Sequence, residues 1–292
     1  MPLWHAVVLG LVQGLTEFLP ISSTAHLLVV RQLLGHAHPD DAFTVVIQLG
    51  TLVAVVAYFR ADLRRILAAA WTELRERRLG STVEGRMAWF IVLGTIPAAA
   101  VGFQFKRQLK DTFFNLPAVA VVATAFALLL AAAEWWARRR ARLGLPPRTD
   151  ADLTWKDALW VGCWQACALM PGGSRSGTTL TGGLFAGLGR AAAARFSFLL
   201  SVPIILGAGI KDLLDEWEKR GTSDPNGRPS LFASADDTAA LIVGTLVSAV
   251  VGYMAVAWLL HFLKRYSTFV FIVYRLVLGA VLAVALAAGW AK

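Results

Sequence analysis

Charged residues are scarce in this chain, and their scarcity excludes an ordinary soluble protein. Only 16% of the 292 residues are Asp, Glu, Lys or Arg, whereas soluble domains carry about 25%. Hydrophobic residues make up 57% of the chain, and the mean hydropathy is +0.60. Several apolar runs reach the roughly 20 residues that a helix needs to cross a bilayer. The composition therefore predicts a multi-pass membrane protein.

Cysteine is nearly absent, and the N-terminus has no basic leader. Cys163 and Cys167 are the only cysteines, with no histidine near them in the sequence, so we expect small core residues and not a metal or redox pair. The N-terminal stretch lacks the basic region and small-residue cleavage site of a signal peptide, so no cleaved leader is expected. The net charge of +9 comes from loops between apolar runs, so we expect no nucleic-acid partner.

Six apolar runs are long enough to be full membrane spans. The loops 60–86, 138–156 and 264–265 are basic, and the loop 211–237 is acidic. Because basic loops mark the cytoplasmic side, alternating spans place both chain ends outside. The predicted spans are 43–59, 87–105, 117–136, 193–210, 238–263 and 269–290.

Two apolar segments that are rich in polar residues remain, 5–35 and 155–188, and they resemble each other. We therefore expect one integral membrane domain, 1–292, built from two repeats at about 1–140 and 155–292. The matched pairs are Ala6/Ala158, Gly10/Gly162 and Gln13/Gln165 and, after one gap, Pro20/Pro171 and Ser23/Ser174.

The arrangement of the two repeats follows from counting spans. If each polar segment is a re-entrant hairpin, three full spans separate corresponding points, and an odd number inverts the second repeat. The hairpin tips then meet near the membrane midplane, as in transporters with inverted repeats. Non-helical backbone is tolerated at that depth only inside protein or around a wet cavity. The expected fold is all-α, with six transmembrane helices and two re-entrant helical hairpins in an inverted-topology repeat.

The first hairpin tip carries several groups capable of chemistry. Gln13 and Glu17 are four residues apart and share a helix face. Pro20 breaks the helix, and the run Ser22-Ser23-Thr24 supplies N-cap hydroxyls for a second helix that is expected to begin near Ala25, with His26 in its first turn. An ionisable residue inside a membrane segment is costly and is functional by default.

The second tip, PGGSRSGTT, suits a phosphate. Gly172 and Gly173 allow close backbone approach, and Arg175 offers a planar fork for phosphate oxygens. The lysine and spacing of a P-loop are missing. Hydroxyls that would help bind a phosphate come from Ser174, Ser176, Thr178 and Thr179.

The two motifs together resemble the bacitracin-resistance family of undecaprenyl-diphosphate phosphatases. The motifs are Gln13-x-x-x-Glu17, PISSTAH at 20–26 and PGGSRSGTT at 171–179, and the likeness extends to FTVVIQLGTLVAVV, ARFSFLLSVP and IVYR. The resemblance implies an enzyme of the bacterial inner membrane that hydrolyses undecaprenyl diphosphate to the monophosphate. It also implies a divalent cation, Mg²⁺ or Ca²⁺, a role in peptidoglycan synthesis and bacitracin resistance, and an active site facing the periplasm.

The same resemblance implies roles for individual residues. Glu17 and Gln13 would hold the metal, although this chain has Gln13 where many relatives have Glu, which weakens one ligand. Glu17, Arg175 and His26 would be catalytic, with His26 as nucleophile or proton carrier beside Ser23. Binding of the substrate would involve Ser22, Ser23, Gly173, Ser174, Ser176 and Thr179.

The sequence argues against one alternative function and leaves a second one open. Phosphatases of the PAP2 type need a histidine at a fixed distance after Ser174-Arg175, and this chain has none there. A lipid-phosphate transporter or flippase is the alternative from a different class, because inverted repeats with broken helices are transporter architecture and fold alone does not decide function. The sequence leaves open the nucleophile, the oligomeric state, the isoprenoid length and any flipping of the product.

Overall fold

The computed structural model describes residues 1–35, 42–218, 231–232 and 234–289, and across these ranges the chain is helical without strands. The predicted all-α class is therefore confirmed. The end of the last predicted span, at residue 290, lies outside the described residues. The helices are α1 (Leu3–Phe18), α2 (Ser23–Leu33), α3 (Ala42–Val46), α4 (Gln48–Tyr58), α5 (Arg60–Glu76), α6 (Val83–Phe113), α7 (Leu116–Arg142), η1 (Asp150–Asp152), α8 (Trp155–Cys167), α9 (Arg175–Phe185), α10 (Arg190–Glu218), α11 (Ala235–Leu263) and α12 (Phe269–Ala287).

Five helices are long and apolar enough to cross a membrane, and these are α6 to residue 105, α7, α10, α11 and α12. The predicted span 43–59 is different, because α3 and α4 are interrupted at Ile47 and the chain then bends by 77° into α5. This segment passes as a sixth span only together with α5. The protein is thus a multi-pass membrane protein with five or six spans among its described residues.

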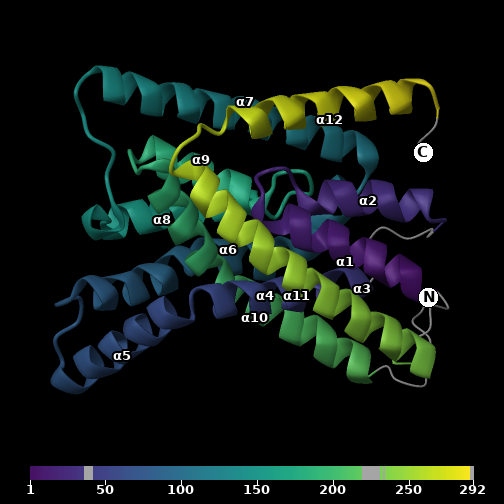
Figure 1. Cartoon of the computed structure of the whole chain (residues 1–292), viewed down its shortest axis with the longest axis horizontal. Coiled ribbons are helices and arrows are strands. Elements are labelled where there is room, and N and C mark those ends of the chain that lie inside the picture. Colours follow the sequence, from purple (N-terminus) through teal and green to yellow (C-terminus); the bar gives the residue numbers. More distant parts are fainter. Residues whose placement is uncertain (36–41, 219–230, 233, 290–292) are drawn as a thin grey trace.

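The two polar segments form short helical hairpins, α1–α2 and α8–α9, whose breaks lie near the centre of the molecule (Figure 1). Each first helix packs against a long helix from the other half of the chain, α1 against α11 and α8 against α6. A Cβ atom on Gly10 would lie 2.5 Å from the Gly244 carbonyl oxygen, and one on Gly162 would lie 2.4 Å from that of Gly94. Glycine is therefore required at both crossings.

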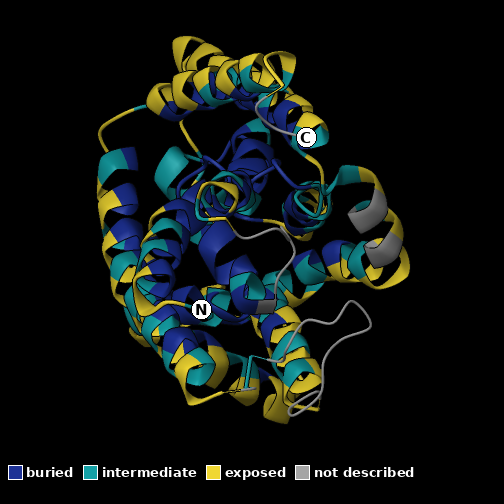
Figure 2. Ribbon diagram, turned by 90° about the vertical axis from the view of Figure 1, so that its right-hand side faces the viewer, coloured by how far each residue is buried: buried dark blue, intermediate teal, exposed yellow. Residues whose placement is uncertain are grey.

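Burial follows the same plan, with buried residues gathered around the hairpins and exposed residues on the outer faces of the long helices (Figure 2). The exposed side chains on those faces are mainly apolar, for example Phe103, Val121 and Val277. In a bilayer such faces contact lipid, so the only place for polar groups at depth is the centre.

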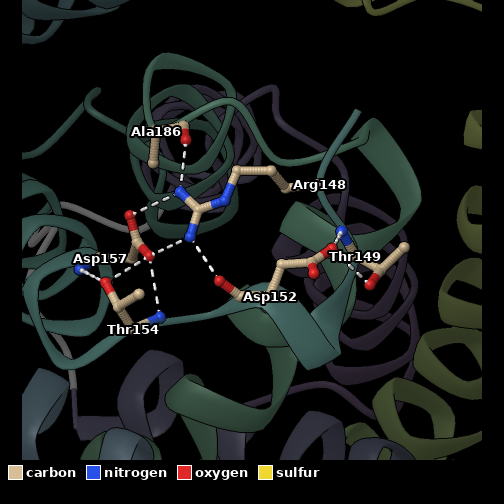
Figure 3. Close-up of polar contacts among 6 residues, drawn as sticks. All are labelled: Arg148, Thr149, Asp152, Thr154, Asp157 and Ala186. Atoms are coloured by element: carbon tan, nitrogen blue, oxygen red, sulfur yellow. Dashed lines mark hydrogen bonds and ion pairs between the residues drawn. The ribbon is translucent and has the colours of Figure 1, made fainter. Parts of the chain in front are cut away.

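A cluster of polar contacts fixes the base of the second hairpin (Figure 3). Arg148 donates to both carboxylate oxygens of Asp157, at 3.0 and 2.6 Å, and to the Ala186 carbonyl at 2.9 Å. Backbone bonds also join Arg148 to Gly187 and Gly189 on the α9–α10 turn. The hydrogen bonds from Arg148 to Asp157 raise the pKa of the guanidinium above its ordinary value, against the opposing effect of partial burial.

Candidate functional site

The first hairpin tip is arranged around Glu17. Helix α1 ends at Phe18, a turn follows, and α2 starts at Ser23, two residues before the expected start. Glu17 is 6% exposed, and its Oε2 atom accepts hydrogen bonds from Gln13 Nε2 at 2.9 Å and from Ser23 Oγ at 2.7 Å. The prediction that Gln13 and Glu17 share one face is confirmed. Gln13 is fully buried, and its Oε1 atom has no partner among the described residues.

The two tips meet through side chains of both hairpins. Arg175 Nη2 lies 3.2 Å from Glu17 Oε1, and Ser176 Oγ donates to the Leu19 carbonyl at 3.0 Å. Arg175 Nη1 is buried and has no acceptor among the described residues. The guanidinium of Arg175, from the second hairpin, therefore pairs with one oxygen of the Glu17 carboxylate. Its Nη1 atom can still donate a hydrogen bond to a ligand.

A small pocket opens at this junction. Five of the predicted site residues line it, and Thr24, Gln48, Ala168, Met170 and Gly172 complete the lining. The five predicted residues are Glu17, Ser22, Ser23, Ser174 and Arg175.

Ser22 and Ser174 have the same unusual backbone conformation. Their φ angles are +74° and +67°, in a region that non-glycine residues rarely adopt and that is often found at functional sites. Each is the N-cap of the following helix and accepts from the backbone N–H three residues later. Ser22 and Ser174 lie 152 residues apart in the sequence (174 − 22), as do Gln13 and Gln165. The two hairpins therefore align without a gap. The expected pairing of Ser23 with Ser174 is therefore wrong by one residue, and Ser23 matches Arg175.

Five of the predicted site residues do not line the pocket. Gln13 donates a hydrogen bond to Glu17, and Ser176 donates one to the Leu19 carbonyl in the first tip. Thr179 Oγ1 bonds the Arg175 carbonyl at 2.7 Å and also contacts Ser197. Gly173 lies in the turn, and its N–H donates to the Met170 carbonyl at 3.0 Å. The fifth is His26.

His26 lies against α12. Its Nδ1 atom is 2.7 Å from the Ser22 carbonyl, and its Nε2 atom is 2.6 Å from the Tyr274 hydroxyl. Because a carbonyl only accepts, Nδ1 carries the proton of the neutral ring and Nε2 accepts from Tyr274. The two rings are stacked with centroids 5.6 Å apart. The imidazole is thus held at both nitrogens, at the edge of the site.

The sequence motifs did not single out Gln48, Tyr274 and Arg275. Gln48 lines the pocket from the start of α4, directly after the interruption at Ile47. Arg275 is fully buried and contacts the second tip. A charged or amide residue inside an apolar run is itself a signal, so Gln48 in FTVVIQLG and Arg275 in IVYR could have been found on that ground.

The donor set at the first tip fits a hard divalent cation. No group of three or more His, Cys, Asp or Glu side chains that could hold a metal occurs among the described residues. Mg²⁺, however, is commonly held by one or two carboxylates together with phosphate oxygens of the substrate. Glu17 would provide the carboxylate, and the unpartnered Oε1 of Gln13 would provide a second oxygen once the amide, whose nitrogen faces Glu17 in this structure, turns over.

These features define a multi-pass membrane protein whose buried pocket brings an arginine, hydroxyls and a carboxylate together, a combination suited to a phosphorylated ligand. The model of the family described as bacitracin resistance protein BacA matches residues 6–281. The chain belongs to this family.

Individual relatives agree over nearly the full chain. The chain is similar to a protein from Prosthecochloris aestuarii, 44% identical over 289 residues, which cover 99% of each chain. It is 46% identical over 279 residues to a protein from Chlorobium phaeobacteroides, covering 96% of this chain and 95% of the relative. It is also 46% identical over 289 residues to a protein from Myxococcus xanthus, covering 99% and 91%. All three relatives carry the name undecaprenyl-diphosphatase.

Proposed function

We propose that this chain hydrolyses undecaprenyl diphosphate to undecaprenyl phosphate and inorganic phosphate, and so recycles the lipid carrier of peptidoglycan synthesis. The observation that carries the proposal is Glu17, held between the Ser23 hydroxyl and the Arg175 guanidinium in a pocket at the junction of the hairpins. The names of relatives up to 46% identical support it. They also favour hydrolysis over transport.

Arg175 is proposed to bind the diphosphate. Its Nη1 atom is free to donate, and a guanidinium matches phosphate oxygens in two-point contact. Ser22 and Ser174 line the same pocket. Three further residues are proposed to hold the binding loop in place without contacting the ligand. Gly173 does so through Met170, Ser176 through Leu19, and Thr179 through Ser197.

Ser23 is the proposed nucleophile, because it lines the pocket and its hydroxyl donates to a carboxylate. Ser23 Oγ attacks the terminal phosphorus, Glu17 takes its proton, and the bond to the bridging oxygen breaks to release undecaprenyl phosphate. Water then attacks the phosphorus of the phosphoserine, the bond to Ser23 Oγ breaks, inorganic phosphate leaves, and the proton on Glu17 returns to Oγ. His26 does not line the pocket, so we propose that it orients the Ser22 carbonyl and the N-terminus of α2.

A divalent cation, Mg²⁺ or Ca²⁺, is proposed to be held by Glu17 and the Oε1 atom of Gln13. When bound, the cation would neutralise charge on the phosphate oxygens. The contribution of Gln13 is a neutral amide oxygen, which predicts a weaker cation site than two carboxylates would give.

For the membrane arrangement we propose six spans, the sixth formed by the bent α3–α5 segment, and the two hairpins as re-entrant elements of an inverted repeat. The equivalence of Ser22 with Ser174 and the reciprocal packing of α1 and α8 support this. The protein would lie in the bacterial inner membrane with its site open to the periplasm. Arg78→Cys and Ser234→Cys, each in a Cys163→Ala/Cys167→Ala background, should react with an impermeant thiol reagent from opposite faces of the membrane.

The proposed activity is tested with purified protein in detergent, Mg²⁺ and a C55 or C15 isoprenyl diphosphate. The wild-type protein should release phosphate, and Arg175→Ala, Glu17→Ala and Ser23→Ala should each lower the rate by about 10³-fold or more in protein that still unfolds cooperatively above the assay temperature. Absence of phosphate release by the wild type across several divalent cations would refute hydrolysis and favour transport. If Ser23→Ala keeps full activity and His26→Ala is inactive, His26 and not Ser23 is the nucleophile.

The proposed function also has a cellular test. Overexpression should raise the bacitracin tolerance of a bacterial host, because hydrolysis removes the diphosphate that bacitracin sequesters. The Arg175→Ala variant at equal membrane abundance should give no protection. Equal protection by both proteins would mean that catalysis is not the cause.

A further inference from the structure

A fully buried guanidinium lies against the loop 171–174. Arg275, in α12, has 0% exposure, and its Nη2 atom donates to the carbonyl oxygens of Gly172 and Gly173, each at 3.0 Å. Among the residues that the structure describes, its Nε and Nη1 atoms have no acceptor and no ion pair includes it. A buried charge without a counter-ion is costly, so it needs a functional explanation.

The two carbonyl contacts fix the direction of the neighbouring N–H groups. In a trans peptide the C=O group and the following N–H point in opposite directions, and the described chain has no cis bonds. The N–H after the Gly172 carbonyl belongs to Gly173 and donates to Met170. The N–H after the Gly173 carbonyl belongs to Ser174 and has no acceptor among the residues that the structure describes. It points away from Arg275.

Arg275 contacts this loop but does not line the pocket. Gly172, Ser174 and Arg175 do line it. A Cβ atom on Gly177 would lie 2.6 Å from Arg275 Nη1, so the guanidinium reaches the first turn of α9. Its positive charge therefore adds to that of the free N–H groups at the start of this helix.

We propose that Arg275 is a positioning residue of the site. By holding the Gly172 and Gly173 carbonyls it turns the Ser174 N–H toward the pocket, where this N–H donates to a phosphate oxygen of the diphosphate. The charge of the guanidinium strengthens the same interaction. This inference rests on the proposed function of the pocket, to which it adds a backbone donor and the residue that aims it.

The test compares Arg275→Met, which has a similar volume and no charge, with Arg275→Lys, which keeps the charge but has a shorter reach. The control is Arg190→Gln, which breaks the ion pair with Glu134 away from the loop. Two quantities are measured, namely phosphate release from the lipid substrate and the Kd of inorganic diphosphate by calorimetry.

Arg275→Met should lower kcat/KM by about 10²–10³-fold, the effect of losing one preorganised donor, and should raise the Kd of inorganic diphosphate at least 10-fold. Arg275→Lys should raise that Kd by a smaller factor, about 5-fold. Arg190→Gln should lower the thermal midpoint and leave the Kd unchanged.

If Arg275→Met binds inorganic diphosphate with the wild-type Kd, the proposal is overturned. If that variant does not fold, a wild-type Kd for Arg275→Lys would overturn the proposal instead. A Kd raised equally by Arg190→Gln would show a general structural effect and also overturn it. If the wild type binds inorganic diphosphate but releases no phosphate, the proposed hydrolysis fails while the role of Arg275 in anion binding stands on the Kd values alone.

Discussion

Replacing Gln13 by glutamate tests where a divalent cation is held. The Gln13 amide nitrogen lies 2.9 Å from Glu17 Oε2, and both side chains are buried. The substitution Gln13→Glu would place a second carboxylate at this distance. The perturbation is therefore a change of charge at nearly constant shape, inside the site.

The size of the effect follows from the distance. At 2.9 Å and an effective dielectric of about 20, two full charges repel by 332/(20 × 2.9), or about 6 kcal/mol. Arg175, on the other oxygen of Glu17, offsets part of this repulsion. Two carboxylates this close repel each other unless a proton or a cation lies between them. A cation between them replaces the proton, so its affinity should rise and depend more strongly on pH.

The assay is phosphate release as a function of Mg²⁺ concentration at pH 6 and pH 8. For Gln13→Glu we expect the half-saturating Mg²⁺ concentration to fall at least 10-fold at pH 8 and less at pH 6. Its thermal midpoint in EDTA should lie below that of the wild type and recover with Mg²⁺.

Gln165→Glu is the matched control, because Gln165 is the equivalent buried amide of the second hairpin and has no carboxylate of the first tip as its partner. It should change stability without changing the Mg²⁺ dependence. An unchanged half-saturating concentration for Gln13→Glu at both pH values would refute a cation site between these side chains.

Three further predictions concern the surroundings of the site. Tyr274→Phe removes the hydroxyl that donates to His26 Nε2; phosphate release should fall by less than 10-fold, whereas a loss near 10³-fold would make the His26–Tyr274 pair catalytic. Arg148→Ala leaves Asp157 Oδ1 and the Ala186 carbonyl without their donor, although Thr154 still donates to Asp157 Oδ2; the change should cost about 1–3 kcal/mol, seen as a lower thermal midpoint, while the exposed control Arg142→Ala should be neutral. Gly10→Ala drives a methyl into the Gly244 carbonyl and should cost about 1–3 kcal/mol; Gly207→Ala, which meets open space in α10, should be neutral or slightly stabilising, and equal effects on the thermal midpoint would contradict the packing argument.

Local chemistry made much of the site predictable. Helix-breaking Pro20 and the hydroxyl run after it correctly predicted a break followed by a new helix, and the spacing of four correctly placed Gln13 beside Glu17. The bent segment α3–α5 was less predictable, because apolar character shows that a segment prefers lipid but not where it bends.

Residues brought in from distant helices were the least predictable. Tyr274 and Arg275 follow the first tip by about 250 residues, and only the packing of α12 places them against His26 and the 171–174 loop. The one-residue error in matching the hairpins has a simple origin. Proline was aligned with proline, whereas the backbone aligns the two serines that hold a positive φ angle.

The crossing of Gly10 with Gly244 has a consequence for how the protein is made. The two residues are 234 positions apart (244 − 10), and α1 cannot reach its packing surface until α11 has been synthesised. At the usual 5–20 residues per second this interval is roughly 10–50 s. During that time the newly inserted Gln13 and Glu17 lack their covering helix, and until Arg175 is synthesised they also lack the arginine of the second hairpin. The surface against which the earliest helix packs is thus among the last parts of the chain to be made, and the hairpin that carries Glu17 must wait in the membrane for most of synthesis before it is covered.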